Sequence, residues 1–163
     1  MSVSISRLVE VLAALGTEFT LQEIITKVKV SPSTARKYVN EMVKKGLVTE
    51  KNGKFVVTEK GLFLLEGKVT KAKTVEDKYA YVFTEESGSP LPLRVNSVEK
   101  LYVVIKHELV PPSVVEYHLR NGYLAKWLLE QISAKALAQR IREIKSTPEL
   151  LRVLEEYLGV STR

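Results

Sequence analysis

The sequence predicts a mainly α-helical protein with one small β-hairpin in its first half and a mostly helical second half. Two observations lead to this fold class. Apolar residues recur at i, i+3, i+4 and i+7 spacing through much of the chain, which is the period of amphipathic helices. The dipeptide Asn52-Gly53 separates two runs of β-forming residues, which is a strong signal for a tight hairpin turn.

Two helices are expected near the start of the chain. The first spans residues 4–15 and is followed by Gly16, a residue type that commonly follows a helix end. Its apolar face carries Ile5, Leu8, Val9, Leu12 and Leu15. The second begins at Thr20, which forms a capping box with Glu23, and it runs to about Val28.

A third helix follows and has a basic exposed face. Ser31 is the expected N-cap, Pro32 occupies the first helical position, and Gly46 ends the helix. The apolar face carries Ala35, Val39, Met42 and Val43, with Tyr38 at its edge, and the opposite face carries Ser33, Arg36, Lys37, Asn40 and Lys44. Short polar side chains near the helix start permit close approach to a groove floor, and the cations can pair with phosphates on the groove walls.

The order helix, helix, helix, hairpin, helix over residues 4–66 resembles the winged helix-turn-helix DNA-binding domains of archaea and bacteria. FTLQEIITKVKVSPSTARKYVNEMVKKGLV is similar to the helix-turn-helix with its following strand, and EKNGKF is similar to the wing. VTEKGLFLLEG is similar to the closing helix, with Thr58 as the cap and Leu62, Phe63 and Leu65 as its packing residues.

This resemblance implies that the helix at 32–45 is a recognition helix for the major groove of double-stranded DNA, with a wing at 50–55. The implied DNA-binding residues are Ser33, Thr34, Arg36, Lys37 and Asn40 on the helix, and Lys51 and Lys54 on the wing. Arg36 and Lys37 lie near a helix start, where the macrodipole disfavours cations, so DNA contact gives a reason for their placement. Lys44 and Lys45, at the helix end, are explained by the dipole alone.

The basic residues are concentrated in the first half of the chain. Of a net charge of +6, residues 1–76 contribute 13 Lys and Arg against 8 Asp and Glu, whereas residues 77–163 contribute 12 against 11. This asymmetry indicates a polyanionic partner for the first half, although a solvated lysine-rich surface accounts for the same counts. Because winged helices also serve as protein-docking modules, the alternative role is docking within replication, transcription or membrane-remodelling machinery.

Residues 67–78 are expected to form a linker from a first domain at 1–66 to a mostly helical interaction or dimerisation domain at 79–163. Tyr79–Thr84 is a strand candidate, and the following ESGSPLPLR is interpreted as a turn region, so one small strand or a hairpin is expected at the start of this half. Helices are expected at 97–108, 113–121 and 123–132. A further helix is expected after a cap at Ser133, with Leu137, Ile141 and Ile144 on its apolar face, and a last helix begins at Thr147. EYHLRNGYLAKWL and ALAQRI resemble an uncharacterised prokaryotic helical domain family over about 79–158, which implies no particular chemistry.

The last helix, 148–158, has an apolar stripe that can either close its own core or pair with a second copy. The stripe consists of Leu150, Leu151, Leu154 and Leu158, with Glu155 and Glu156 opposite. Many helix-turn-helix proteins dimerise to match two half-sites, so a homodimer is one expectation for this half, and a protein partner bound through 79–163 is another.

Several function classes lack sequence support. Glu116 and His118 point to different sides of a helix, so no metal site is expected, and no nucleophile motif or glycine-rich phosphate loop occurs. We therefore expect no catalytic residues and no cofactor, and a protein that is not an enzyme. The chain has no cysteine, no long apolar run and no signal peptide, which favours a cytoplasmic protein without membrane contact, and its Lys/Glu-rich composition fits a thermophile. The leading hypothesis is an archaeal-type transcription regulator.

Overall fold

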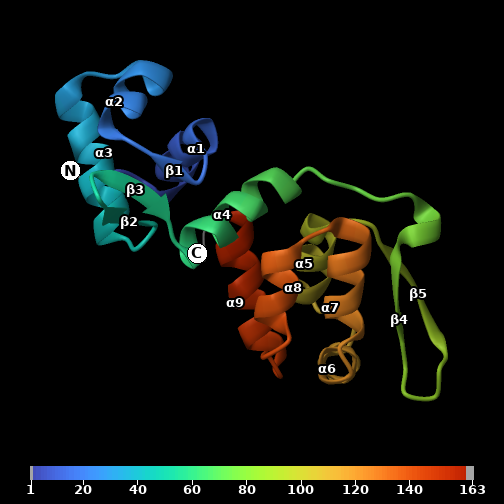
Figure 1. Cartoon of the computed structure of the whole chain (residues 1–163). Coiled ribbons are helices and arrows are strands. Elements are labelled where there is room, and N and C mark those ends of the chain that lie inside the picture. Colours follow the sequence, from blue (N-terminus) through green and yellow to red (C-terminus); the bar gives the residue numbers. More distant parts are fainter. Residues whose placement is uncertain (1, 161–163) are drawn as a thin grey trace. The chain divides into compact units, whose positions relative to one another are not determined.

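The computed structural model describes residues 2–160 and divides into two compact units, the first up to Leu65 and the second from Glu66 onward (Figure 1). The fold is mainly α-helical, as the sequence predicts, and it has two small antiparallel sheets, one of which contains the predicted hairpin. The boundary between the units falls inside one helix, α4 (Glu59–Thr70).

Before α4 begins, the first unit contains three helical segments and a three-stranded sheet. The helical segments are α1 (Ile5–Leu15), α2 (Leu21–Glu23), which continues as a π-helical turn (Ile24–Lys29), and α3 (Pro32–Lys44). The strands are β1 (Glu18–Phe19), β2 (Val48–Lys51) and β3 (Lys54–Val57), in the order β1-β3-β2. The predicted capping box is present, since Thr20 Oγ1 accepts a hydrogen bond from Glu23 N at 3.2 Å.

Strand β1 is a part of the sheet that the sequence does not reveal, because two residues are too short for any periodic pattern. Its Phe19 pairs with Phe55 of β3, with ring centroids 5.7 Å apart, and both side chains are buried. The core around them is formed by fully buried side chains of Leu8, Leu12, Ile24, Met42 and Leu47. Ile5, expected on the inner face of α1, is 44% exposed, because it occupies the first position of the helix, before the buried stripe begins at Leu8.

The predicted hairpin turn is confirmed. Asn52 has φ of 51° and Gly53 has φ of 78°, so both central positions of the two-residue turn adopt the positive φ that a type I′ turn requires. Lys51 and Lys54 face each other across the start of the turn. The turn and its flanking residues form the wing, residues 50–55.

The start of α4 is tied to the end of α3 through Thr58. Its hydroxyl accepts a hydrogen bond from Gly61 N at 3.2 Å and donates one to the carbonyl of Gly46 at 2.6 Å. Gly61 packs against the carbonyl of Leu47, which turns this side of α4 toward the core. Leu64, three residues on, is therefore buried, whereas Leu62, expected to pack inward, is 42% exposed.

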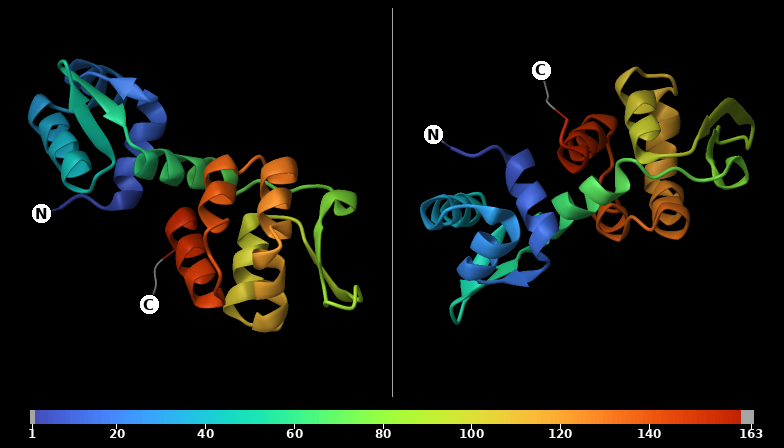
Figure 2. Two further views of the ribbon diagram at one scale, coloured as in Figure 1. Left: turned by 60° about the horizontal axis from the view of Figure 1, so that its bottom comes forward. Right: turned by 90° about the horizontal axis from the view of Figure 1, so that it is seen from above.

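The second unit has a β-hairpin at one end of a group of helices (Figures 1 and 2). After the end of α4 and a 3₁₀ turn (Asp77–Tyr79), the elements are β4 (Tyr81–Thr84), β5 (Pro90–Val95), α5 (Val98–Lys106), α6 (Pro112–Arg120), α7 (Tyr123–Trp127) with a π-helical continuation (Leu128–Ile132), α8 (Lys135–Ile141) and α9 (Thr147–Leu158).

Strand β5 forms within the stretch interpreted as a turn region, so the start of this half is a hairpin and not a single strand. Its two prolines, Pro90 and Pro92, argue against a strand inside a larger sheet, because proline cannot donate a ladder hydrogen bond. The sheet has only β4 and β5, so both strands are edges and proline is tolerated. The register shifts between Val82 and Thr84, which is the irregularity that accommodates this pairing.

The segment 67–78, expected as a linker, is partly regular structure attached to the second unit. Its first residues complete α4, which runs to Thr70. Lys73 Nζ donates a hydrogen bond to the carbonyl of Ile132 at 2.5 Å, and Val75 N donates one to the carbonyl of Asn96 at 2.9 Å. These contacts join residues distant in sequence, which is why local composition alone suggests a free linker.

Helix α8 is capped by a distant carboxylate and not by Ser133. Ser133 adopts a left-handed conformation with φ of 62° and ends the preceding π-helical turn. The carboxylate of Glu66 in α4 instead accepts hydrogen bonds from Ala136 N at 2.8 Å and Leu137 N at 3.0 Å. An anion at a helix N-terminus satisfies the free N–H groups and interacts favourably with the macrodipole.

The apolar stripe of α9 closes the core of its own unit. Leu150, Leu154 and Leu158 are buried, Leu151 is half-buried, and α9 packs against α5, α6 and α8. Glu155, expected on the outer face, is also buried and accepts a hydrogen bond from the hydroxyl of Tyr102 at 3.4 Å. The dimer contact considered for this stripe would therefore require the core to open.

His118 is buried between β4 and the helices. It is 2% exposed, and its Nε2 lies 2.9 Å from Thr84 N and 2.8 Å from Thr84 O, while Nδ1 contacts the hydroxyl of Tyr81. Burial lowers the pKa of His118 because the charged imidazolium loses hydration, and the hydrogen bond with the Thr84 backbone only partly opposes this.

We predict that the stability of the second unit falls as the pH drops below about 6.5, the ordinary histidine value. A lowered folded-state pKa means that the unfolded chain takes up the proton first, so the contribution of neutral His118 is present above this pH and is lost in acid. NMR titration should place the midpoint of His118 below 6.5, and urea unfolding should show a lower midpoint at pH 5 than at pH 7. A His118 midpoint above 6.5 would contradict this reading.

Candidate nucleic-acid interface

Helix α3 is held in place by its cap and its buried stripe. Ser31 Oγ accepts a hydrogen bond from Thr34 N at 3.2 Å, and Pro32 opens the helix. Three apolar side chains, Ala35, Val39 and Met42, are buried, and the helix contacts α2, the π-helical turn and β2. The side of α3 opposite this stripe is therefore fixed outward.

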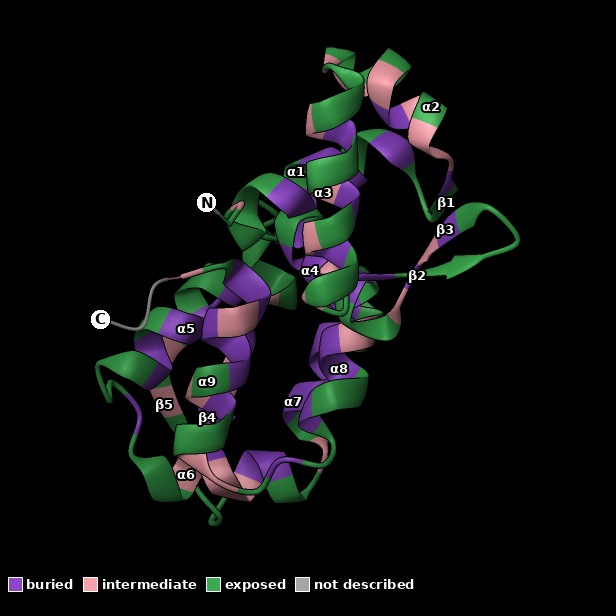
Figure 3. Ribbon diagram, turned by 90° about the vertical axis from the view of Figure 1, so that its left-hand side faces the viewer, coloured by how far each residue is buried: buried purple, intermediate pink, exposed green. Residues whose placement is uncertain are grey.

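Most of the predicted contact residues on α3 lie on this outward side. Ser33, Arg36, Lys37 and Asn40 are exposed, and together with Glu41 and Lys44 they line an open hollow of about 440 Å³. Thr34 differs, because it is half-buried and its hydroxyl accepts a hydrogen bond from Ser31 at 3.0 Å. Figure 3 shows the exposed side of α3 and the exposed β2–β3 loop in green.

Arg36 and Lys37 are not neutralised by carboxylates. Within residues 2–160, neither cation has an Asp or Glu oxygen within 4 Å. Other cations of the first unit do have acidic partners, in the pairs Lys27–Glu23 at 3.2 Å, Lys45–Glu41 at 3.7 Å and Lys54–Glu18 at 3.3 Å. Two unpaired positive charges therefore stand side by side on the exposed face of α3.

Tyr38 belongs to the edge of the core. It is half-buried, and its hydroxyl accepts a hydrogen bond from Arg7 Nε of α1 at 3.3 Å. The Arg7 guanidinium also lies 5.6 Å from the centre of the Tyr38 ring. These contacts link α1 to α3, in agreement with the interpretation of Tyr38 as a packing residue.

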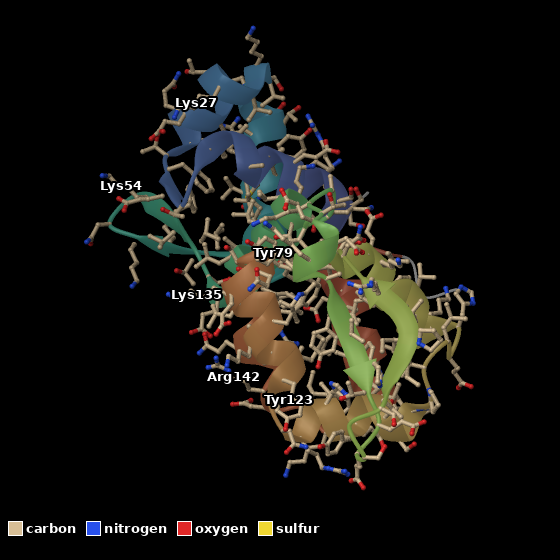
Figure 4. All side chains as sticks on the ribbon, turned by 90° about the vertical axis from the view of Figure 1, so that its right-hand side faces the viewer. Lys27, Lys54, Tyr79, Tyr123, Lys135 and Arg142 are labelled. Atoms are coloured by element: carbon tan, nitrogen blue, oxygen red, sulfur yellow. The ribbon has the colours of Figure 1, made fainter. Side chains whose placement is uncertain are left out.

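The wing carries both signs of charge. Lys51 and Lys54 are exposed, and Lys54 projects from the hairpin (Figure 4). Lys54 is paired with Glu18 of the neighbouring β1, and Glu50 precedes Lys51 on β2. These two lysines and two glutamates cancel, so the hairpin and its neighbouring strand add no net positive charge to the surface.

A second hollow, of about 330 Å³, lies between α3 and the sheet. It is lined by Leu21, Arg36, Val39, Asn40, Val43, Glu50 and Phe55. Val43, expected in the core, is instead 46% exposed at this hollow. The reason is that the buried stripe of α3 passes through Met42, and Val43 lies about 100° further around the helix.

The first unit combines three helices with a short sheet that includes a hairpin, and one of the helices has a basic exposed face. This combination defines a winged-helix module of the nucleic-acid-binding type. The family model for winged helix-turn-helix proteins matches residues 4–86, which is half of the chain, and the chain belongs to this family. No curated protein and no solved structure matches the chain. Membership in this family points to DNA binding, and the resemblance of the first half to winged helix-turn-helix domains is confirmed.

Two further features of residues 2–160 bear on other kinds of site. In this part of the chain, His, Asp and Glu residues nowhere gather in groups of three or more that could hold a metal ion. None of its helices combines the length and the apolar run that crossing a membrane requires.

Sequence reasoning missed the acidic residues beside the interface. Glu18 lies on β1, which no sequence pattern indicates. Glu50 lies on β2 between Thr49 and Lys51, and all three residues are exposed, so burial does not set Glu50 apart. Strand alternation from buried Val48 would have placed Glu50 on the side of the sheet that faces α3.

Ser31 and Ser33 allow the N-cap of α3 to be tested separately from its exposed surface. We predict that Ser31→Ala lowers the free energy of unfolding of the first unit by about 1 kcal/mol, because the Thr34 N–H loses its acceptor. Ser33→Ala should change this free energy of unfolding by less than about 0.5 kcal/mol, because Ser33 is exposed and its side chain hydrogen-bonds only with the Ser31 hydroxyl among the described residues. Urea unfolding of the two variants measures this difference, and equal losses would contradict the assignment of Ser31 as the cap.

Proposed function

We propose that the protein is an archaeal-type transcription regulator that binds double-stranded DNA through α3 and the wing. The observation that carries the proposal is the pair of exposed, unneutralised cations, Arg36 and Lys37, on the outward face of a helix held rigidly by its buried stripe. Family membership supports the DNA-binding part of this role. The regulatory, archaeal and cytoplasmic parts are inferences from the sequence, and the role is one of binding without catalysis.

In this proposal α3 lies in the major groove and its exposed residues divide the work of recognition. Arg36 and Asn40 have the side chains that form bidentate hydrogen bonds with guanine and adenine, respectively. Lys37 pairs with a phosphate on the groove wall, and the short side chains of Ser33 and Thr34 allow the helix start to approach closely. Lys51 and Lys54 at the wing reach the neighbouring backbone or minor groove.

The second candidate function is a protein-docking winged helix, and one observation favours it. Glu18 and Glu50 balance the two wing lysines, whereas a surface built only for polyanions would gain from removing these acids. Salt dependence separates the two roles. Affinity for duplex DNA falls steeply with salt, because each neutralised phosphate releases counterions.

We also propose a homodimer or a protein partner for the second unit. Three of the four leucines of the α9 stripe are buried in their own unit, so a partner would use other surfaces, such as Val103 and Leu109, which are 43% and 56% exposed. Light scattering of the full chain should then give a mass near twice 18.4 kDa for the homodimer. A mass of one chain at all accessible concentrations would remove the homodimer.

We predict that Arg36→Ala and Lys37→Ala weaken duplex binding without lowering the melting temperature, because both side chains are exposed and unpaired. Lys37→Ala should weaken all sequences alike and reduce the salt slope by about 0.9, the value for one phosphate. Arg36→Ala should cost about 1–3 kcal/mol at a preferred site and relax the preference there.

Fluorescence anisotropy with labelled duplex provides the measurement for both variants. Lys100→Ala is the matched control, since it removes one exposed positive charge from α5 of the second unit. If both α3 variants bind DNA as tightly as the parent chain, the assignment of α3 to the groove is wrong.

A further inference from the structure

Glu50 occupies a defined place between α3 and the wing. In the β2–β3 pairing it lies opposite Phe55, whose ring packs on Phe19 in the core. Cross-strand partners point to the same side of a sheet, so Glu50 points to the side that carries the core and α3. It shares the 330 Å³ hollow with Arg36 and Asn40, the two proposed base-reading residues.

This hollow is the place where DNA backbone would cross the surface. If α3 lies in the major groove and the tip of the wing reaches the neighbouring groove, the sugar-phosphate strand that separates the two grooves must pass between them. The phosphates on that strand then lie over the hollow. Their nearest charged neighbours from the protein would be Arg36 on one side and Glu50 on the other.

Glu50 remains a free negative charge at this position. Within residues 2–160, its carboxylate has no Lys, Arg or His nitrogen within 4 Å, in contrast to Glu18, which is paired with Lys54 at 3.3 Å. The floor of the hollow is apolar, formed by buried Val39 and Phe55 with the half-exposed Val43. A phosphate placed there meets an apolar floor, with Arg36 on one side and, on the other, a like charge that no ion pair within 4 Å neutralises among the described residues.

We propose that Glu50 is a specificity-determining residue. It weakens those complexes with duplex DNA that are held by phosphate contacts alone. This inference rests on the proposed function. Repulsion between Glu50 and the crossing backbone weighs most on a complex that is held by phosphate contacts alone. In a complex with base contacts, Arg36 and Asn40 hold α3 in one position in the groove, with the phosphates further from Glu50, so the repulsion costs that complex less. Building in a repulsive element against the wrong complex is a general route to specificity. It also gives the acidic residue on the wing a role in a DNA-binding surface.

The test compares Glu50→Gln with the parent chain on random duplex and on duplex that the parent chain enriches from a random pool. Glutamine keeps the size and polarity of the side chain and removes its charge. We expect random duplex to bind roughly two- to fivefold tighter, the range of one exposed charge pair. The ratio of enriched-site affinity to random-duplex affinity should fall. Glu85→Gln is the matched control, an equal charge change at an exposed position beyond β4 in the second unit, and it should leave both affinities unchanged.

Each other outcome overturns the proposal. Unchanged or weaker binding of Glu50→Gln to random duplex would mean that Glu50 does not oppose phosphates. Equal tightening on enriched and random duplex would show a general charge effect without a role in specificity. In both cases the parent chain still binds DNA and the proposed function stands. If neither the parent chain nor Glu50→Gln binds duplex at low salt, the proposed function fails and this inference fails with it.

Discussion

The apolar stripe of α3 is the contact on which the rest of the interface depends. Ala35, Val39 and Met42 are buried against the neighbouring helices and the sheet, and they fix the rotation of the helix about its axis. Because successive residues lie about 100° apart, this rotation sends Arg36, Lys37 and Asn40 outward together. A small change in the packing of the stripe would therefore change which side chains meet a partner.

The charges around α3 differ between the helix and the wing. On the helix, Arg36 and Lys37 have no acidic partner within 4 Å among the residues that the structure describes, whereas the lysine at the wing tip, Lys54, is paired with Glu18. A surface that attracted phosphates everywhere would bind any duplex strongly, since this electrostatic contribution is independent of sequence. Placing free cations on the helix and balanced charges on the wing concentrates the attraction at the element that can reach base edges.

Features with a local signal could be predicted from the sequence, and features made by distant contacts could not. The N-cap at Ser31, the capping box at Thr20 and the turn at Asn52-Gly53 each depend on neighbouring residues, and each is present. Strand β1 exists only because β3 pairs with it, and α8 is capped by Glu66, 70 residues away from Ala136 along the chain. Local patterns carry no information about such partners.

The candidate site was predictable to a similar extent. Helical periodicity placed Ser33, Arg36, Lys37 and Asn40 on one exposed face, which is where the structure has them. Periodicity did not separate Val43 from the buried stripe, because a residue at the edge of an apolar face is buried or exposed according to what packs beside it. Thr34 illustrates the same limit, since its hydroxyl is engaged by the Ser31 cap and only half exposed.

The most direct test of the account is a titration of the full chain with random duplex DNA at a series of salt concentrations. The account predicts measurable binding at low salt, with log affinity falling linearly against log salt and a slope of about −0.9 for each phosphate neutralised. A chain that shows no duplex affinity at low salt, or an affinity that does not change with salt, would contradict the claim that the exposed cations of α3 bind DNA.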